Sequence, residues 1–110
     1  MAYPTSNLDY SNGVNSPGSA TVAGATATLI DDDNGVVNIY TEASEVTVTL
    51  TDLSVGHETV LVAAGAGGLT LNTTGMTLIG SSPSTTVAQN EALFVKQTAA
   101  STWLVLGGTS

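Results

Sequence analysis

The residues best suited to chemistry in this chain are three consecutive aspartates, which meet an Asn-Gly pair in the stretch LIDDDNGVVNIYTE at 29–42. An EF-hand calcium loop needs oxygen ligands at positions 1, 3 and 5, glycine at position 6 and an acid at position 12. Counted from Asp31, Asp33 and Glu42 fit positions 3 and 12, but Gly35 falls at position 5. Asn-Gly between alternating runs is a strong hairpin signal, because both residues tolerate positive φ. The stretch therefore predicts a hairpin turn, and an adventitious cation bound by the aspartates is the alternative.

Two further stretches contain residue types that active sites use. In AAGAGGLTL at 63–71, a G-x-G-x-x-G phosphate loop would need a glycine where Thr70 stands, and a helix would have to follow. We expect a Gly-rich hairpin turn there instead. Asp52, Ser54 and His57 supply the residue types of a catalytic triad, but they crowd one short loop and no G-x-S-x-G elbow presents the serine. We therefore expect no catalytic residues in this loop.

The residue types that hold metals are scarce. His57 is the only histidine and there is no cysteine, which excludes sites built from several histidines, thiolate sites and disulfides. We expect no metal site and no cofactor. Since no catalytic set is present either, we expect a protein that is not an enzyme.

Composition narrows the range of partners. The chain has 110 residues, the usual size of one domain, and only 9% of them are charged, against about 25% in typical soluble domains. Nine acids and a single basic residue, Lys96, give a net charge of −8. Nucleic acids and anionic membranes both bind through Lys and Arg, so we expect neither as a partner. A basic protein surface remains open as a partner.

Targeting and membrane signals are missing from the sequence. The N-terminus MAYPTSNLDY has no basic region followed by an apolar core, so it does not predict a secretory signal. No apolar run approaches the length of a membrane span. We expect the protein to be made and folded in a cytoplasm.

The hydrophobic pattern predicts strands. Residues 1–18 have no hydrophobic period and many turn formers, and so predict an extended N-terminal arm. Beyond them, short alternating runs separated by turn residues predict strands, with no sustained helical stripe. The expected strands lie at 21–30, 36–40, 45–50, 58–64, 69–72, 76–79, 85–88, 91–97 and 102–106. This pattern predicts an all-β single domain over residues 19–110, a β-sandwich or jelly roll.

Three of the expected strands are apolar on both faces, namely ETVLVAA at 58–64, ALFVK at 92–96 and TWLVL at 102–106. A small domain covers few positions on both sides, so a second subunit is expected to cover some of these faces. We therefore predict a homo-oligomer. The candidate contact residues are Val60, Val62, Phe94 and Trp103 in these strands, and Tyr3, Leu8 and Tyr10 in the arm.

Two of these assignments have alternatives. Trp103 suits a core or interface anchor better than a platform for sugar binding. The arm is long enough to lie across a neighbouring copy and add a strand to its edge, with Tyr3, Leu8 and Tyr10 as anchors. The alternative is an arm folded back on its own domain.

A family resemblance adds to this picture. The stretches EVTVTLTDLSVGHETVLVAAGAGGLTLN, AQNEALFVK and STWLVLGG follow one another within residues 35–108. In order and spacing, they resemble a small β-module found in virion proteins of tailed bacteriophages, including head decorations and tail fibres. Thr51 stands where that family usually has a proline. The resemblance implies a structural role, commonly as a trimer, and brings no catalytic residues with it.

The function expected on these grounds is that of a capsid decoration (cement) protein. It would sit in the virion as a homotrimer, bind the major capsid protein on the outer surface of the phage head and stabilise the shell. The alternative is a tail-fibre or receptor-binding module that recognises a host-surface carbohydrate, with Trp103 or the tyrosines stacking on the sugar.

Overall fold

The structure is a computed structural model and describes residues 18–80 and 85–107. Within these ranges the chain forms strands joined by short loops and one single-turn 3-10 helix, η2, at Asp31–Asp33. The strands are β1 (Ser19–Val22), β2 (Thr26–Thr28), β3 (Val37–Tyr40), β4 (Val46–Thr49), β5 (Glu58–Ala63), β6 (Leu69–Asn72), β7 (Thr77–Ile79), β8 (Thr86–Val87), β9 (Ala92–Ala99) and β10 (Thr102–Gly107).

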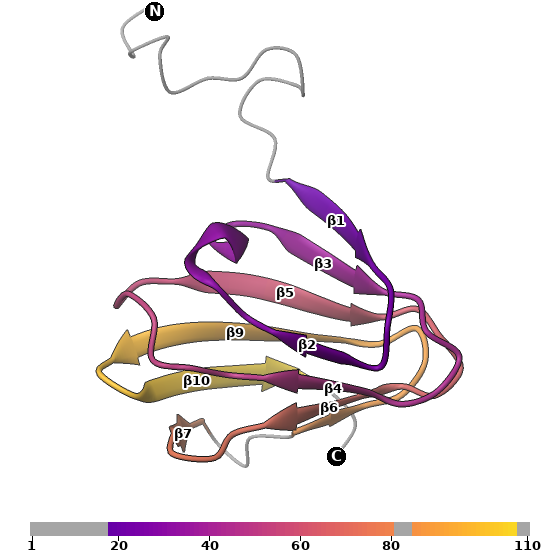
Figure 1. Cartoon of the computed structure of the whole chain (residues 1–110). Coiled ribbons are helices and arrows are strands. Elements are labelled where there is room, and N and C mark those ends of the chain that lie inside the picture. The colour runs from indigo at the N-terminus through magenta and orange to yellow at the C-terminus, as the bar shows by residue number, and fades with distance from the viewer. Residues whose placement is uncertain (1–17, 81–84, 108–110) are drawn as a thin grey trace, which may run out of the picture.

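The strands form two sheets that lie one over the other. The six-stranded sheet has the order β1-β3-β5-β9-β10-β7, and the four-stranded sheet has the order β2-β4-β6-β8. In Figure 1, β2 and β4 cross in front of the six-stranded sheet. The chain passes from one sheet to the other after each of the first eight strands and returns as a hairpin only at β9 and β10.

Successive strands of each sheet stack in parallel. In the six-stranded sheet, β1 pairs with β3 and β3 with β5, so that Ser19 lies beside Val37 and Val37 beside Val60. In the four-stranded sheet, β2 pairs with β4 and β4 with β6, which places Val46 beside Leu69. The pairs β1–β2, β3–β4 and β5–β6 are therefore three rungs of a short β-solenoid-like coil.

This arrangement corrects part of the expected fold class. The all-β prediction with two packed sheets is confirmed, but the predicted jelly roll is wrong. A jelly roll is built from antiparallel Greek-key strands, whereas the strands of these three rungs stack in parallel. The physical reason is that the loops between strands cross from sheet to sheet, so each new strand runs in the same direction as the strand one rung earlier.

Antiparallel strands close the coil after its third rung. In the six-stranded sheet, β9 pairs antiparallel with β5, β10 antiparallel with β9, and β7 parallel with β10. In the four-stranded sheet, β8 pairs antiparallel with β6. The first rung has no such cover within the described residues, and β1 and β2 remain sheet edges.

The core lies between the two sheets. One apolar cluster joins both layers and comprises Leu29, Tyr40, Val46, Val48, Leu50, Leu61, Ala63, Leu69, Leu71, Val87, Leu93, Val95, Trp103 and Val105. Trp103 is fully buried, and its indole N–H donates a hydrogen bond of 3.2 Å to the carbonyl oxygen of Thr51. Burial raises the pKa of the Tyr40 phenol above its ordinary value, and the charge of Asp33 adds to this effect.

The strand predictions match the structure closely, with one exception. The strand expected at 21–30 is two strands, β1 and β2, because the chain turns between the sheets around Gly24, which has a φ of 99°. A non-glycine residue rarely adopts that conformation. The continuous apolar alternation across this turn concealed the break.

The two predicted hairpin turns are wrong in the same way. The DDDNG stretch forms η2 and a turn in which Val36 donates a hydrogen bond to the carbonyl of Asp33, with Asn34 at φ −59° and Gly35 at φ 77°. These angles describe a type II turn. The turn joins β2 and β3, which belong to different sheets, and the Gly-rich stretch likewise joins β5 and β6. Both stretches are corners of the coil.

Close stacking of corners explains the Gly-rich stretch. The corner after β5 lies directly on the corner after β3, and the amides of Ala64 and Gly65 both donate to the carbonyl of Tyr40. A Cβ at Gly65 would lie 1.8 Å from the carbonyl oxygen of Glu42, and a Cβ at Gly67 would lie 2.2 Å from the carbonyl carbon of Ser44. Glycine is needed here because backbone meets backbone.

This contact generates a stability prediction. Gly67→Ala should destabilise the protein by about 2–3 kcal/mol or more, since the obstructing atoms are backbone and cannot rotate away. Gly18→Ala is the control, because a Cβ there meets only the Val36 side chain at an ordinary 3.6 Å. Thermal unfolding measures both variants. Equal melting temperatures for the two would contradict the stacked corner.

Candidate functional site

The residue types that resemble a catalytic triad do not meet. His57 is buried, and its Nε2 atom donates to the carbonyl oxygen of Ile30 at 3.0 Å, while its ring packs edge-on against Trp103 with centroids 5.7 Å apart. The Asp52 carboxylate accepts hydrogen bonds from the Gln97 amide at 2.6 Å and from the backbone N–H of Ser101 at 2.9 Å. These side chains hold the loop after β4 against β9 and β10.

Gln97 is the centre of that network. Its side chain is fully buried, accepts a hydrogen bond from the backbone N–H of Leu53 at 2.7 Å, and donates to Asp52 and to the carbonyl of Ala99. The backbone N–H of Ser101, followed by the side-chain amide of Gln97, holds the pKa of Asp52 below its ordinary value. The carboxylate is thus stabilised in its charged form by donors from the β9–β10 hairpin.

One aspartate of η2 also has a structural partner. The Asp33 carboxylate accepts a hydrogen bond from the backbone N–H of Ile30 at 2.9 Å. A polar hollow lies beside this turn, lined by residues of the loops at 31–34 and 54–57. In the described ranges, no group of three or more histidine or carboxylate side chains is placed to hold a metal ion.

A different feature stands out on the far side of the six-stranded sheet. Along β3, β5, β9 and β10, alternate residues are buried in the core, so the residues between them point away from it. Most of these are apolar. We call this surface, together with Ile79 on the neighbouring β7, the outer face; its large apolar members are Val37, Ile39, Val60, Val62, Ile79, Phe94, Leu104 and Leu106.

The strand register aligns the outer face into rows. Val37, Val60, Phe94 and Leu106 lie side by side on four neighbouring strands. A second row contains Ile39 and Val62, and a third places Leu104 beside Ile79. Leu106 is 49% exposed and Ile79 is 39% exposed, while the valines and Phe94 shield one another in part.

Charged and polar groups border this apolar surface. Glu58 and Lys96 lie opposite each other on β5 and β9, in the same row as Leu104 and Ile79, and form an ion pair of 3.3 Å. On the other side, Ser19 and Thr21 of the edge strand β1 lie beside Val37 and Ile39. An apolar centre with a polar rim is the pattern of an association surface.

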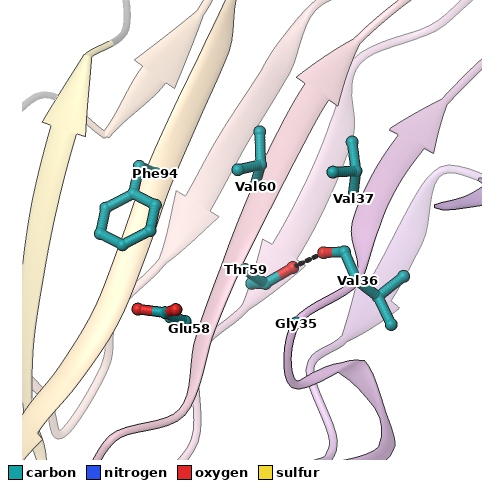
Figure 2. Close-up of a pocket in the computed structure, with 7 residues that line it drawn as sticks. All are labelled: Gly35, Val36, Val37, Glu58, Thr59, Val60 and Phe94. Carbon is teal, nitrogen blue, oxygen red and sulfur yellow. Dashed lines mark hydrogen bonds between the residues drawn. The ribbon is translucent and has the colours of Figure 1, made fainter. Parts of the chain in front are cut away.

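The outer face has a hollow where β3 and β5 begin, beside Phe94 of β9. A pocket of about 170 Å³ is lined by Gly35, Val36, Val37, Glu58, Thr59, Val60 and Phe94. Figure 2 shows Val37, Val60 and Phe94 projecting from three neighbouring strands, with Glu58 at the lower margin. The Thr59 hydroxyl donates to the Val36 carbonyl and also accepts from the Asn38 amide, which ties β5 to β3 beneath the pocket. The space beside Gly35 is open, since a Cβ there would meet nothing within 4 Å.

The structure places the predicted contact residues in three different settings. Val60, Val62 and Phe94 lie on the outer face, as contact residues would have to. Trp103 lies in the core, so its side chain is not available to a partner or to a sugar. Tyr3, Leu8 and Tyr10 fall outside the described residues.

Sequence reasoning missed Val37 and Ile39. The signal was present in VVNIY at 36–40, where Val37 and Ile39 alternate with Asn38 and Tyr40. The pattern was hard to interpret because the polar Asn38 suggests the exposed side. In the structure Asn38 faces the core, where its amide donates to the Thr59 hydroxyl at 3.1 Å.

Comparisons with known proteins give no family. No protein-family model matches the chain, and a search of curated proteins finds no significant match. Over the described residues, no helix has the length and apolar character needed to cross a membrane.

The Asp52 network generates a prediction about pH. Because the pKa of Asp52 is lowered on folding, its carboxylate contributes stability above the unfolded-state pKa of about 4, and this contribution disappears as the pH falls through the lower folded-state pKa. Asp52→Asn should flatten the fall in melting temperature below about pH 4. The unaltered chain, measured in the same buffers, is the control. Identical profiles for Asp52→Asn and the unaltered chain would refute this role.

Proposed function

We propose that this protein is a non-enzymatic virion structural protein, a capsid decoration protein that assembles as a homotrimer on the outer surface of a phage head. The observation that carries the proposal is the outer face. Exposed apolar surface of this continuity is unfavourable in water and marks a surface that another protein covers. The resemblance to phage β-modules supplies the virion setting.

The outer face is smaller than a standard protein–protein interface. The five strands that carry it, at about 4.8 Å spacing, are roughly 19 Å across, and strands of about 15–20 Å then give on the order of 300–400 Å² in projection. A standard interface buries about 800 Å² on each partner. The resemblance to phage β-modules implies a trimer, so we propose that three outer faces turn toward a common axis and bury one another.

The rest of the surface suits a basic partner. Nine acids and one lysine leave the chain with a net charge of −8, and Lys96 is paired with Glu58. A positively charged patch on the major capsid protein would complement this surface and speed association. Each trimer would bridge neighbouring shell subunits, and the summed binding free energy would raise the barrier to rupture of the shell.

One observation favours the second candidate, a tail-fibre module. The first rung leaves β1 and β2 as sheet edges, so a preceding segment of a shaft could continue the coil in parallel, as repeat structures do. The proposed sugar platform is weakened, since Trp103 and Tyr40 are both buried. This candidate therefore rests on the open rung alone.

Assembly through the outer face generates a prediction. Light scattering of the full chain should give a mass of about 33 kDa, three times the 11.0 kDa of one copy. Val62→Asp should convert the trimer to a folded monomer, because it places an unpaired charge in the interface without entering the core. Thr28→Asp, on the exposed side of the four-stranded sheet, should leave the mass unchanged. A monodisperse mass near 11 kDa for the unaltered chain would contradict the proposal.

Location on the particle separates the two candidates. We expect antibody or gold labelling of intact virions to give a regularly spaced signal over the head, because a decoration protein repeats with the shell lattice. Signal confined to the tail would replace the decoration proposal with the fibre module.

A further inference from the structure

The pocket on the outer face lies where the N-terminal segment joins the sheet. The carbonyl of Gly18, the first described residue, accepts a hydrogen bond of 2.9 Å from the backbone N–H of Val37, which lines the pocket. A Cβ on Gly18 would also contact Val36, a second lining residue, at 3.6 Å. The first described residue therefore lies at the wall of the pocket.

The pocket has the volume and the apolar lining of a site for one aromatic ring. A volume of about 170 Å³ is close to that of engineered apolar cavities that bind benzene, roughly 150 Å³. Val60 and Phe94 offer apolar contacts to a ring, and the Glu58 carboxylate at the margin can accept a hydrogen bond. A tyrosine combines these two requirements, since its ring is apolar and its hydroxyl is a donor.

We propose that the side chain of Tyr10 from the same chain occupies this pocket, with its ring against Val60 and Phe94 and its hydroxyl donating to Glu58. Tyr10 precedes Gly18 by eight residues, which can span up to about 27 Å when extended. The pocket lies only about two strand spacings from β1, roughly 10 Å away. The excess length lets the chain reverse at the intervening Asn12-Gly13 pair, which favours a turn.

With Tyr10 in the pocket, the outer face would lose its hollow. Tyr10 would fill the hollow between the rows and give neighbouring copies a flatter apolar surface to cover. The proposal thus deepens the proposed assembly through this face, but intramolecular binding of Tyr10 can hold whether or not the chain is a trimer.

A double-mutant cycle in the full chain tests the contact. Tyr10→Ala and Phe94→Ala should each lower the melting temperature, and the double variant should fall no further than Phe94→Ala alone, because both changes remove one interaction. Tyr10→Phe should keep most of the effect of the ring. Tyr3→Ala is the matched control and should combine additively with Phe94→Ala. Additive losses for Tyr10 and Phe94 would overturn the proposal.

Photo-crosslinking identifies the chain to which Tyr10 binds. With p-benzoylphenylalanine at position 10, the expected product has the mass of one copy and joins position 10 to the peptide around Val60 or Phe94. A crosslink between two copies, or to another part of the surface, would overturn intramolecular binding. A light-scattering mass near 11 kDa together with the expected crosslink would contradict the trimer and leave the Tyr10 site supported, so the two proposals fail separately.

Discussion

The parallel register between successive rungs is the constraint on which the rest of the structure depends. Backbone hydrogen bonds fix Val37 beside Val60, and the antiparallel return of β9 then fixes Phe94 beside Val60. Because side chains alternate across a sheet, this one register sends Leu61 and Leu93 into the core and aligns the outer row on the opposite side. A shift of one residue would exchange the two faces. The core, the outer face and the pocket are therefore consequences of the same pairing.

Contacts made by the loops maintain this register at the ends of the strands. Glycine at positions 65 and 67 lets one corner rest on another, and the Asp52–Gln97 hydrogen bond fixes the loop after β4 to the β9–β10 hairpin. The Gln97 amide is buried, and a buried polar group is costly when unpaired but stabilises one arrangement when its partners are present. Residue types that resemble catalytic or phosphate-binding motifs are thus used for structure in this chain.

The positions of the strands could be predicted from the sequence, but their connection could not. Alternation of valine, threonine and leucine marks a strand whatever its neighbours are, and the apolar character of both faces around Val60 and Phe94 identified much of the outer face. A loop such as DDDNG predicts a turn. Its residues do not determine whether the next strand pairs with the preceding strand or belongs to the other sheet. That choice depends on contacts distant in sequence, such as those made by Gly67 with Ser44. The role of Asn38 was hidden for the same reason, since its partner Thr59 lies on another rung.

The central claim is that another copy covers the outer face, and oxidative footprinting of side chains tests it most directly. Leu106 on the outer face and Ile30 in the corner after β2 are similarly exposed in one copy, at 49% and 52%, so Ile30 serves as an internal reference. At working concentration the account predicts that Leu106 and Phe94 are protected while Ile30 is oxidised, and that dilution below the dissociation constant of the assembly restores oxidation of Leu106. Equal oxidation of Leu106 and Ile30 at every concentration would contradict the account.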